Sequence, residues 1–185
     1  MSNLEAGEVE TAWTDALHTS EKSSHSTTLG NREGIIIKSW QQVTNTSPQV
    51  VYNLFTGLGG KRGWLYFNSV WQLRGIADRL FGGVGLRRGR RHPSEVRVGD
   101  AVDFWRVEAV EPSRMLRLRS EMKDPGQLWL QFQLTYDKDS KTVLTQTLFY
   151  APKGLWGFLY WYVFYPLHNL VFAGLIQRLA KLGLE

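Results

Sequence analysis

Hydrophobic and polar residues alternate at every second position through much of residues 95–150. The alternation is regular over 101–111 and 115–122, and it continues in a third segment through Leu128, Leu130, Phe132 and Leu134. A last strand is expected over 143–150, and turn-forming residues separate the segments at 112–114, 124–126 and 138–141. Successive short strands at hairpin spacing predict an antiparallel meander.

The residues before this meander predict one strand, one helix and an irregular insertion. β-branched residues favour a strand over 35–40, while Ser47-Pro48 favours a helix that starts with Ser47 as N-cap and ends at Gly57. Residues 61–93 mix a helical pattern with several glycines and an arginine-rich stretch at 87–91. An aromatic, glycine-hinged insertion of this kind is typical of a lid over a pocket.

The segment 154–177 contains no Asp, Glu, Lys or Arg. Its length would allow it to cross a bilayer, for which about 20 apolar residues suffice. It would also suit a core helix gripped by a curved sheet, and the strands have no other long apolar helix to cover them. Pro166, where the helix is expected to break or restart, and the polar His168 and Asn169 favour the core helix. The membrane segment remains the alternative.

The N-terminal residues 1–33 differ in composition from the remainder. They are rich in Ser, Thr, Glu and His, hold six acids and two bases, and predict a mostly disordered polar tail. With an overall charge of +5, residues 34–185 carry +9, which favours anionic partners. The sequence contains no cysteine, and its N-terminus does not read as a secretory signal, so we expect a cytoplasmic protein.

Together these elements predict an α+β fold for residues 34–185. The order is strand, helix, insertion, antiparallel strands and one long C-terminal helix. This arrangement predicts a helix-grip (START-like) fold, in which a curved antiparallel sheet surrounds the C-terminal helix and leaves an internal cavity.

Several spaced motifs also carry a resemblance to a known family. They are Gly63-Trp64-Leu65-Tyr66, Trp71-x-Leu73-Arg74-Gly75, the arginine-rich 85–91, the stretch 99–108 and the start of the apolar segment at 154–161. In these motifs the chain resembles an uncharacterised domain family of the START-like (SRPBCC, polyketide-cyclase-like) superfamily, often found after an NAD(P)-binding epimerase-like domain in longer bacterial proteins. This chain resembles only the START-like part. The resemblance implies the helix-grip fold and supplies no reaction.

The chain is rich in aromatic residues, with 8 Trp, 7 Tyr and 9 Phe, and we expect some of them to line a hydrophobic cavity. Hydrophobic pockets with a few directed polar groups are the usual form of small-molecule sites. The expected walls are Trp64, Trp71, Trp105, Trp129, Tyr160 and Tyr165. At the mouth, Arg74, Arg87 or Arg91 would meet an anionic group of the ligand. In the arginine-rich stretch 87–91, the alternative is that the arginines are solvated and paired with nearby acids.

Three residues are candidates for proton transfer, and each also has a structural interpretation. Asp103 and Glu121 could serve as acid or base in the cavity, or could form cross-strand ion pairs. His168 could be a catalytic acid or base, or a buried polar group that has found a partner. No spacing typical of a metal site is present, the glycines at 83, 85 and 89 lack the strand and spacing of a dinucleotide-binding loop, and we expect no cofactor.

The leading functional prediction is therefore binding of a hydrophobic or aromatic, sometimes anionic, small molecule between sheet and helix. The alternatives are a cyclase-, dehydratase- or isomerase-type enzyme in the same cavity, a membrane-associated protein anchored by 155–176, and an accessory partner of a separate NAD(P)-binding protein. Nucleic acid is not expected as a partner, because the aromatic residues lie in apolar runs and do not alternate with the bases.

Overall fold

A computed structural model describes residues 25–32, 34–59, 62–80, 82, 83, 85, 91, 92 and 95–183. Their helices and strands, in chain order, are β1 (His25–Arg32), β2 (Ile35–Thr44), α2 (Pro48–Thr56), α3 (Asn68–Leu80), β3 (Ala101–Val102), β4 (Trp105–Glu111), β5 (Met115–Ser120), β6 (Gly126–Tyr136), β7 (Thr142–Pro152) and α4 (Gly154–Leu182).

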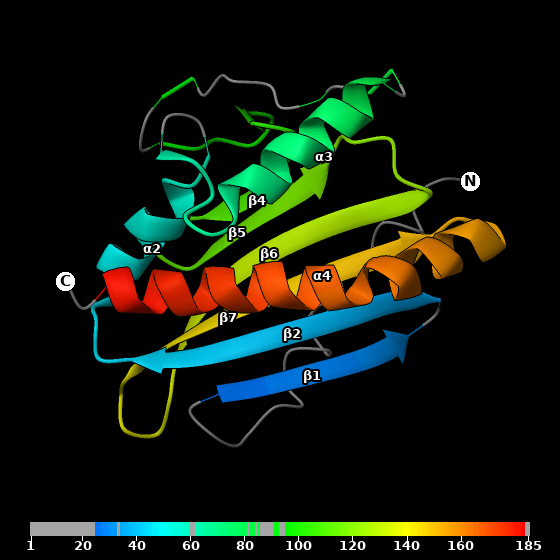
Figure 1. The fold of residues 1–185 in the computed structure, drawn as a ribbon. Coiled ribbons are helices and arrows are strands. Elements are labelled where there is room, and N and C mark those ends of the chain that lie inside the picture. The colour runs from blue at the N-terminus through cyan, green and yellow to red at the C-terminus, as the bar shows by residue number, and fades with distance from the viewer. Residues whose placement is uncertain are drawn as a thin grey trace, which may run out of the picture.

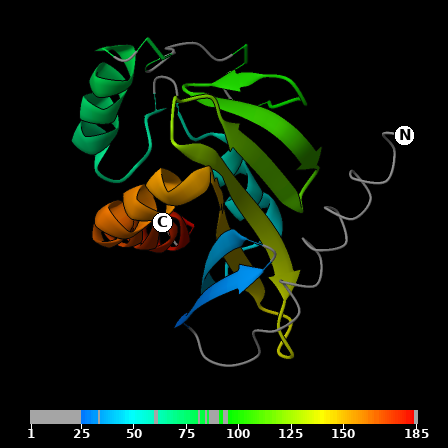
Figure 2. The same cartoon turned by 90° about the vertical axis from the view of Figure 1, so that its right-hand side faces the viewer.

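The strands form a seven-stranded antiparallel sheet in the order β1-β2-β7-β6-β5-β4-β3. Strands β4 to β7 are the predicted meander, and β2 joins it through a nine-residue register with β7 that runs from Ile36–Tyr150 to Thr44–Thr142. The sheet curves, and α4 lies across its concave face (Figures 1 and 2). The predicted helix-grip architecture is therefore confirmed.

Alternate positions of the central strands face α4, as the period of two requires. On β7, Gln146 donates a hydrogen bond to the carbonyl of Phe172 (2.9 Å), and Tyr150 stacks on Trp161 with ring centroids 5.2 Å apart. On β2, Trp40 lies 6.0 Å from Phe172 between ring centroids. These contacts place the hydrophobic core between the concave face and one side of the helix.

Helix α4 continues through Pro166, so the expected break at this residue is wrong. Proline lacks an N–H, and the carbonyl four residues earlier, that of Tyr162, loses its usual donor. Both Pro166 and Tyr162 are exposed, so water can hydrate this carbonyl and the helix can tolerate the proline.

Two further expectations differ from the structure. Residues 25–32 form the edge strand β1 paired to β2, so the sheet begins before the expected tail boundary at residue 33, while residues 1–24 lie outside the described residues.

The segment 101–111 is a hairpin, because Asp103 adopts a positive φ of 54° and Val102 pairs with Trp105. The turn buries both Phe104 and Trp105, which strict alternation would place on opposite faces.

Candidate functional site

A pocket of about 240 Å³ lies between the β1–β2 edge of the sheet and α4. The sheet contributes residues of β1 and β2, and α4 contributes residues spaced about one turn apart along one side. The described residues that line it are Thr27, Lys38, Trp40, Gln41, Gln42, Tyr165, Asn169, Ala173, Ile176 and Gln177. Aromatic and aliphatic groups therefore share the wall with an ammonium, two hydroxyls and several amides.

Lys38 is the unusual member of this wall. It alternates with Ile36 and Trp40 on the buried face of β2, and only 7% of its surface is exposed. Its ammonium donates a hydrogen bond to the hydroxyl of Tyr165 (3.0 Å) and lies 5.4 Å from the centre of that ring. It also lies 5.8 Å from the centre of the Trp40 ring.

No carboxylate of the described residues forms an ion pair with Lys38. A charge removed from water is costly unless it is paired or hydrogen-bonded, and two aromatic faces and one hydroxyl replace only part of its hydration. The ammonium therefore has unused capacity to interact with an anion or a polar oxygen that enters the pocket.

The predicted tryptophan wall lies elsewhere and is closely packed. Trp64, Trp71 and Trp105 are all buried and gather around Phe104, with ring centroids 5.0–6.0 Å from it. The indole N–H of Trp64 donates to the carboxylate of Asp103 at 2.8 Å. These three tryptophans do not line the pocket beside Lys38; they fill core space where α3 and the β3–β4 hairpin meet α4.

The other predicted aromatic residues fall into three different environments. Tyr165 lines the pocket. Trp129 is half-buried and has the parity of the sheet face that points away from α4, since the neighbouring Leu128 and Leu130 are buried on the inner face. Tyr160 packs against Tyr150 and Phe164, with ring centroids 6.2 and 4.9 Å away.

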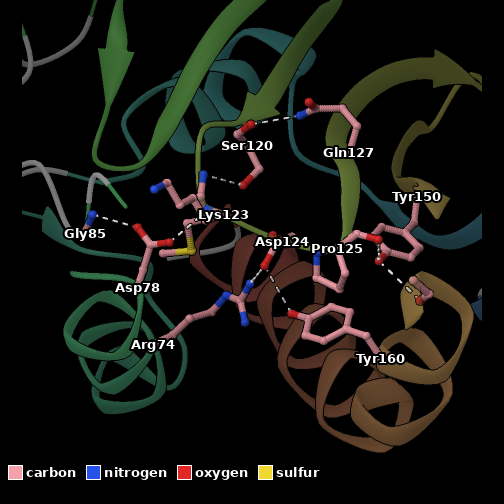
Figure 3. A network of polar contacts seen from close by, with 12 residues as sticks. Arg74, Asp78, Gly85, Ser120, Lys123, Asp124, Pro125, Gln127, Tyr150 and Tyr160 are labelled. Carbon is pink, nitrogen blue, oxygen red and sulfur yellow. Dashed lines mark hydrogen bonds and ion pairs between the residues drawn. The ribbon is translucent and has the colours of Figure 1, made fainter. Parts of the chain in front are cut away.

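Of the predicted anion-binding arginines, Arg74 and Arg91 do not line the pocket. Arg74 of α3 forms an ion pair with Asp124, whose carboxylate also accepts a hydrogen bond from the hydroxyl of Tyr160 at 3.4 Å (Figure 3). Burial is the largest cause that raises the pKa of Tyr160, to about 12, so its hydroxyl stays protonated. Arg91 pairs with Asp100 at 3.1 Å, and Arg87 lies outside the described residues.

The cluster in Figure 3 is a structural junction. Asp78 of α3 accepts hydrogen bonds from the backbone N–H groups of Gly85 and Lys123, at 2.8 and 2.9 Å. Together with the Arg74–Asp124 pair, these bonds tie α3 to the loop that precedes β6. The carboxylate of Asp124 compensates the charge of Arg74, so this guanidinium already has an anionic partner.

None of the three candidates for proton transfer lines the pocket. Asp103 is buried beside Trp64, as described above. Glu121 accepts two hydrogen bonds from Arg106, at 3.0 and 3.1 Å, and Glu108 pairs with Arg119 at 3.7 Å. The interpretation of Glu121 as a member of a cross-strand ion pair is therefore the one the structure supports.

His168 of α4 does not line the pocket and lies among the rings of Tyr160, Trp161, Phe164 and Phe172. Burial, with a smaller contribution from the charge of Arg74, lowers its pKa to about 4. The imidazole is therefore neutral at pH 7. Its Nδ1 has no hydrogen-bond partner among the described residues.

Residues 37–175 match the family described as "Protein of unknown function (DUF2867)". The matched region covers most of the fold and includes Lys38 and Tyr165. The chain belongs to this family. Comparison with curated protein sequences finds no match.

The fold of this DUF2867 member is also found in solved structures. CalU16 from Micromonospora echinospora superposes with a TM-score of 0.52 at 10% identity, over 86% of this chain and 84% of that one. Truncated norcoclaurine synthase from Thalictrum flavum gives a TM-score of 0.48 at 13% identity, over 90% and 99% of the two chains. At 10% identity the likeness to CalU16 concerns the fold alone, and it agrees with the predicted helix-grip fold.

Proposed function

We propose that this DUF2867 protein binds a small aromatic or apolar molecule that carries an anionic group, in the pocket between β2 and α4. The observation that carries the proposal is Lys38, a buried ammonium that faces a pocket and pairs with no carboxylate in the described part of the chain. The anion would lie against Lys38 and the Tyr165 hydroxyl. The apolar body would pack on Trp40 and Ile176.

The size of the pocket limits the ligand. Its volume of about 240 Å³ is below the roughly 300–1,000 Å³ typical of sites for drug-sized molecules. We therefore expect a compact ligand with one or two rings. Asn169 and Gln177 add amide groups that can orient polar substituents.

A matched pair of probes tests the role of the charge. We expect 2-naphthoate to bind the wild-type chain more tightly than the neutral 2-naphthamide, as measured by isothermal titration calorimetry. Lys38→Met keeps most of the length of the side chain and removes the ammonium. Because a hydrogen bond to a charged group is worth about 1.5–3 kcal/mol, the variant should lose about tenfold or more in naphthoate affinity and little in naphthamide affinity.

Lys141→Met is the control, since it removes the same charge from an exposed loop lysine that pairs only weakly with Asp139 (3.9 Å). It should bind both probes as the wild type does. If Lys38→Met and Lys141→Met lose the same naphthoate affinity, the loss comes from the lower net charge and not from the pocket. Unchanged naphthoate affinity in Lys38→Met would contradict the proposal.

An enzyme of the cyclase, dehydratase or isomerase type is the second candidate. It is favoured by the 3.0 Å contact between Lys38 and Tyr165, the two titratable side chains among the described pocket residues. Such a pair can donate a proton to a developing oxyanion on a bound ligand. The predicted cytoplasmic location and the predicted NAD(P)-binding partner stay predictions.

A further inference from the structure

Helix α4 exposes a continuous apolar face on the side opposite the sheet. Large hydrophobic residues recur there at helical spacing, and each has between 37% and 83% of its surface exposed. They are Leu155, Trp156, Leu159, Tyr162, Val163, Phe164, Leu167 and Leu170. A helix that is apolar on all sides is normally buried on all sides, so this face lacks its covering.

Helix α3 extends the apolar surface beside α4. Its exposed residues Leu73, Ile76 and Leu80 recur at spacings of three and four, which places them on one side of the helix. The guanidinium of Arg74 lies 5.7 Å from the centre of the Tyr160 ring, so the two helices are neighbours, as Figure 2 also shows. Soluble monomers rarely expose apolar patches that extend over several turns of two helices.

The charges around this surface are positive. No Asp or Glu occurs between 154 and 182, whereas Lys153, Arg178 and Lys181 are exposed at the two ends of α4. The acid of α3, Asp78, is buried and bonded to backbone N–H groups. A partner that is both apolar and anionic therefore complements the hydrophobic residues of this face and the bases that flank it.

The face can lie on a bilayer but cannot cross one in this fold. Helix α4 is long and apolar enough to span a membrane, yet its other side packs on the sheet through residues such as Trp161, Phe172 and Leu179. Crossing would expose the concave face of the sheet. A helix with one apolar side free instead lies in the plane of the interface, with aromatic residues and flanking bases at the headgroup level.

We propose that the exposed faces of α4 and α3 dock this protein onto the surface of an anionic lipid bilayer. A second copy of the chain fits less well, because two α4 faces brought together in either direction would juxtapose Arg178 and Lys181 with other bases and offer no acid to pair with them. The docking proposal is independent of the ligand proposed for the pocket.

Vesicle flotation with the full chain tests the proposal. We expect the wild type to float with vesicles of phosphatidylcholine containing about one quarter phosphatidylserine, and more weakly with phosphatidylcholine alone. The variant Leu159→Glu/Val163→Glu places two carboxylates on this face, at residues that are both exposed. Its partition onto the anionic vesicles should fall about tenfold or more.

Val98→Glu is the matched control, because Val98 is as exposed as Val163 (65% against 61%) and lies outside both helices. It should float like the wild type. The proposal is overturned if the wild type binds neither vesicle or if the double variant binds as well as the wild type. It is also overturned if sedimentation shows a wild-type dimer that the double variant dissociates while vesicles bind neither form.

Discussion

At the scale of single residues, the fold buries two polar groups beside α4 in different surroundings. The ammonium of Lys38 contacts Tyr165 of α4, whereas His168 of the same helix lies among aromatic rings. One is a buried cation beside a pocket, and the other is a neutral imidazole buried by its neighbours. Their environments suggest a binding role for the first and a structural role for the second.

The burial of His168 predicts a pH-dependent stability. Its pKa of about 4 in the folded chain is below the ordinary value of 6.5, so between these values the unfolded chain binds a proton that the folded chain does not. The titration of His168 therefore does not change the free energy of unfolding above pH 6.5. As the pH falls from 6.5 toward 4, it lowers that free energy by about 3 kcal/mol in total.

Urea unfolding of the wild type and of His168→Phe between pH 7 and pH 4 measures this effect. Phenylalanine keeps a ring among Tyr160, Trp161 and Phe172 and cannot titrate. Other acids, including the Asp124 that pairs with Arg74, contribute equally to both chains. The wild type should lose more stability than the variant across this range, and parallel losses would show that His168 does not titrate as described.

The sequence could have revealed Lys38 but not the pocket. The period of two places Lys38 on the same face as Ile36 and Trp40, which marks it as a lysine on a buried face. The volume beside it depends on how α4 sits across β2. That cannot be deduced from a helix that is apolar on every side, and the arginines were the more conspicuous cations.

At the scale of elements, close backbone approach fixes the start of α4. A Cβ added at Gly157 would lie 2.4 Å from the carbonyl oxygen of Pro125 and 2.8 Å from the Cα of Pro152. These are backbone atoms at the ends of β6 and β7, and they cannot move independently of the sheet. Glycine at this position therefore allows the start of α4 to approach the backbone at Pro125 and Pro152 closely.

We expect Gly157→Ala to destabilise the fold by about 1–3 kcal/mol, although alanine favours helices over glycine. Thermal unfolding measures the change. Gly30→Ala in β1 is the matched control, because nothing lies within 4 Å of the added Cβ. An unchanged melting temperature for Gly157→Ala would mean that the helix can shift away from the sheet at low cost.

The strands differ in how well the sequence predicted them. Strand β5 follows the alternation closely, because one face is buried and the other is half-exposed, whereas β7 is buried on both faces from Leu144 to Tyr150. Strand β1 has few large apolar residues and pairs along its own whole length with residues 35–42 of β2, an interaction between strands that the local pattern of β1 does not contain. The hairpin at Asp103 was hidden because it depends on a positive φ at a residue other than glycine.

At the scale of the whole molecule, the packing between the sheet and α4 differs from one side of the helix to the other. Towards α3 and the β3–β4 hairpin, aromatic rings fill the core around Phe104 and Trp71. Towards β1 and β2, a pocket opens beside Lys38. The family resemblance predicted the architecture, and the packing of particular side chains decides which part of it can hold a ligand.

A crystal structure of the chain soaked with 2-naphthoate tests this account most directly. The account predicts density for the ligand between β2 and α4, with its carboxylate within hydrogen-bond distance of the Lys38 ammonium and its rings against Trp40 and Ile176. Density confined to the exposed face of α4, or a pocket that stays free of naphthoate at saturating concentration, would contradict it.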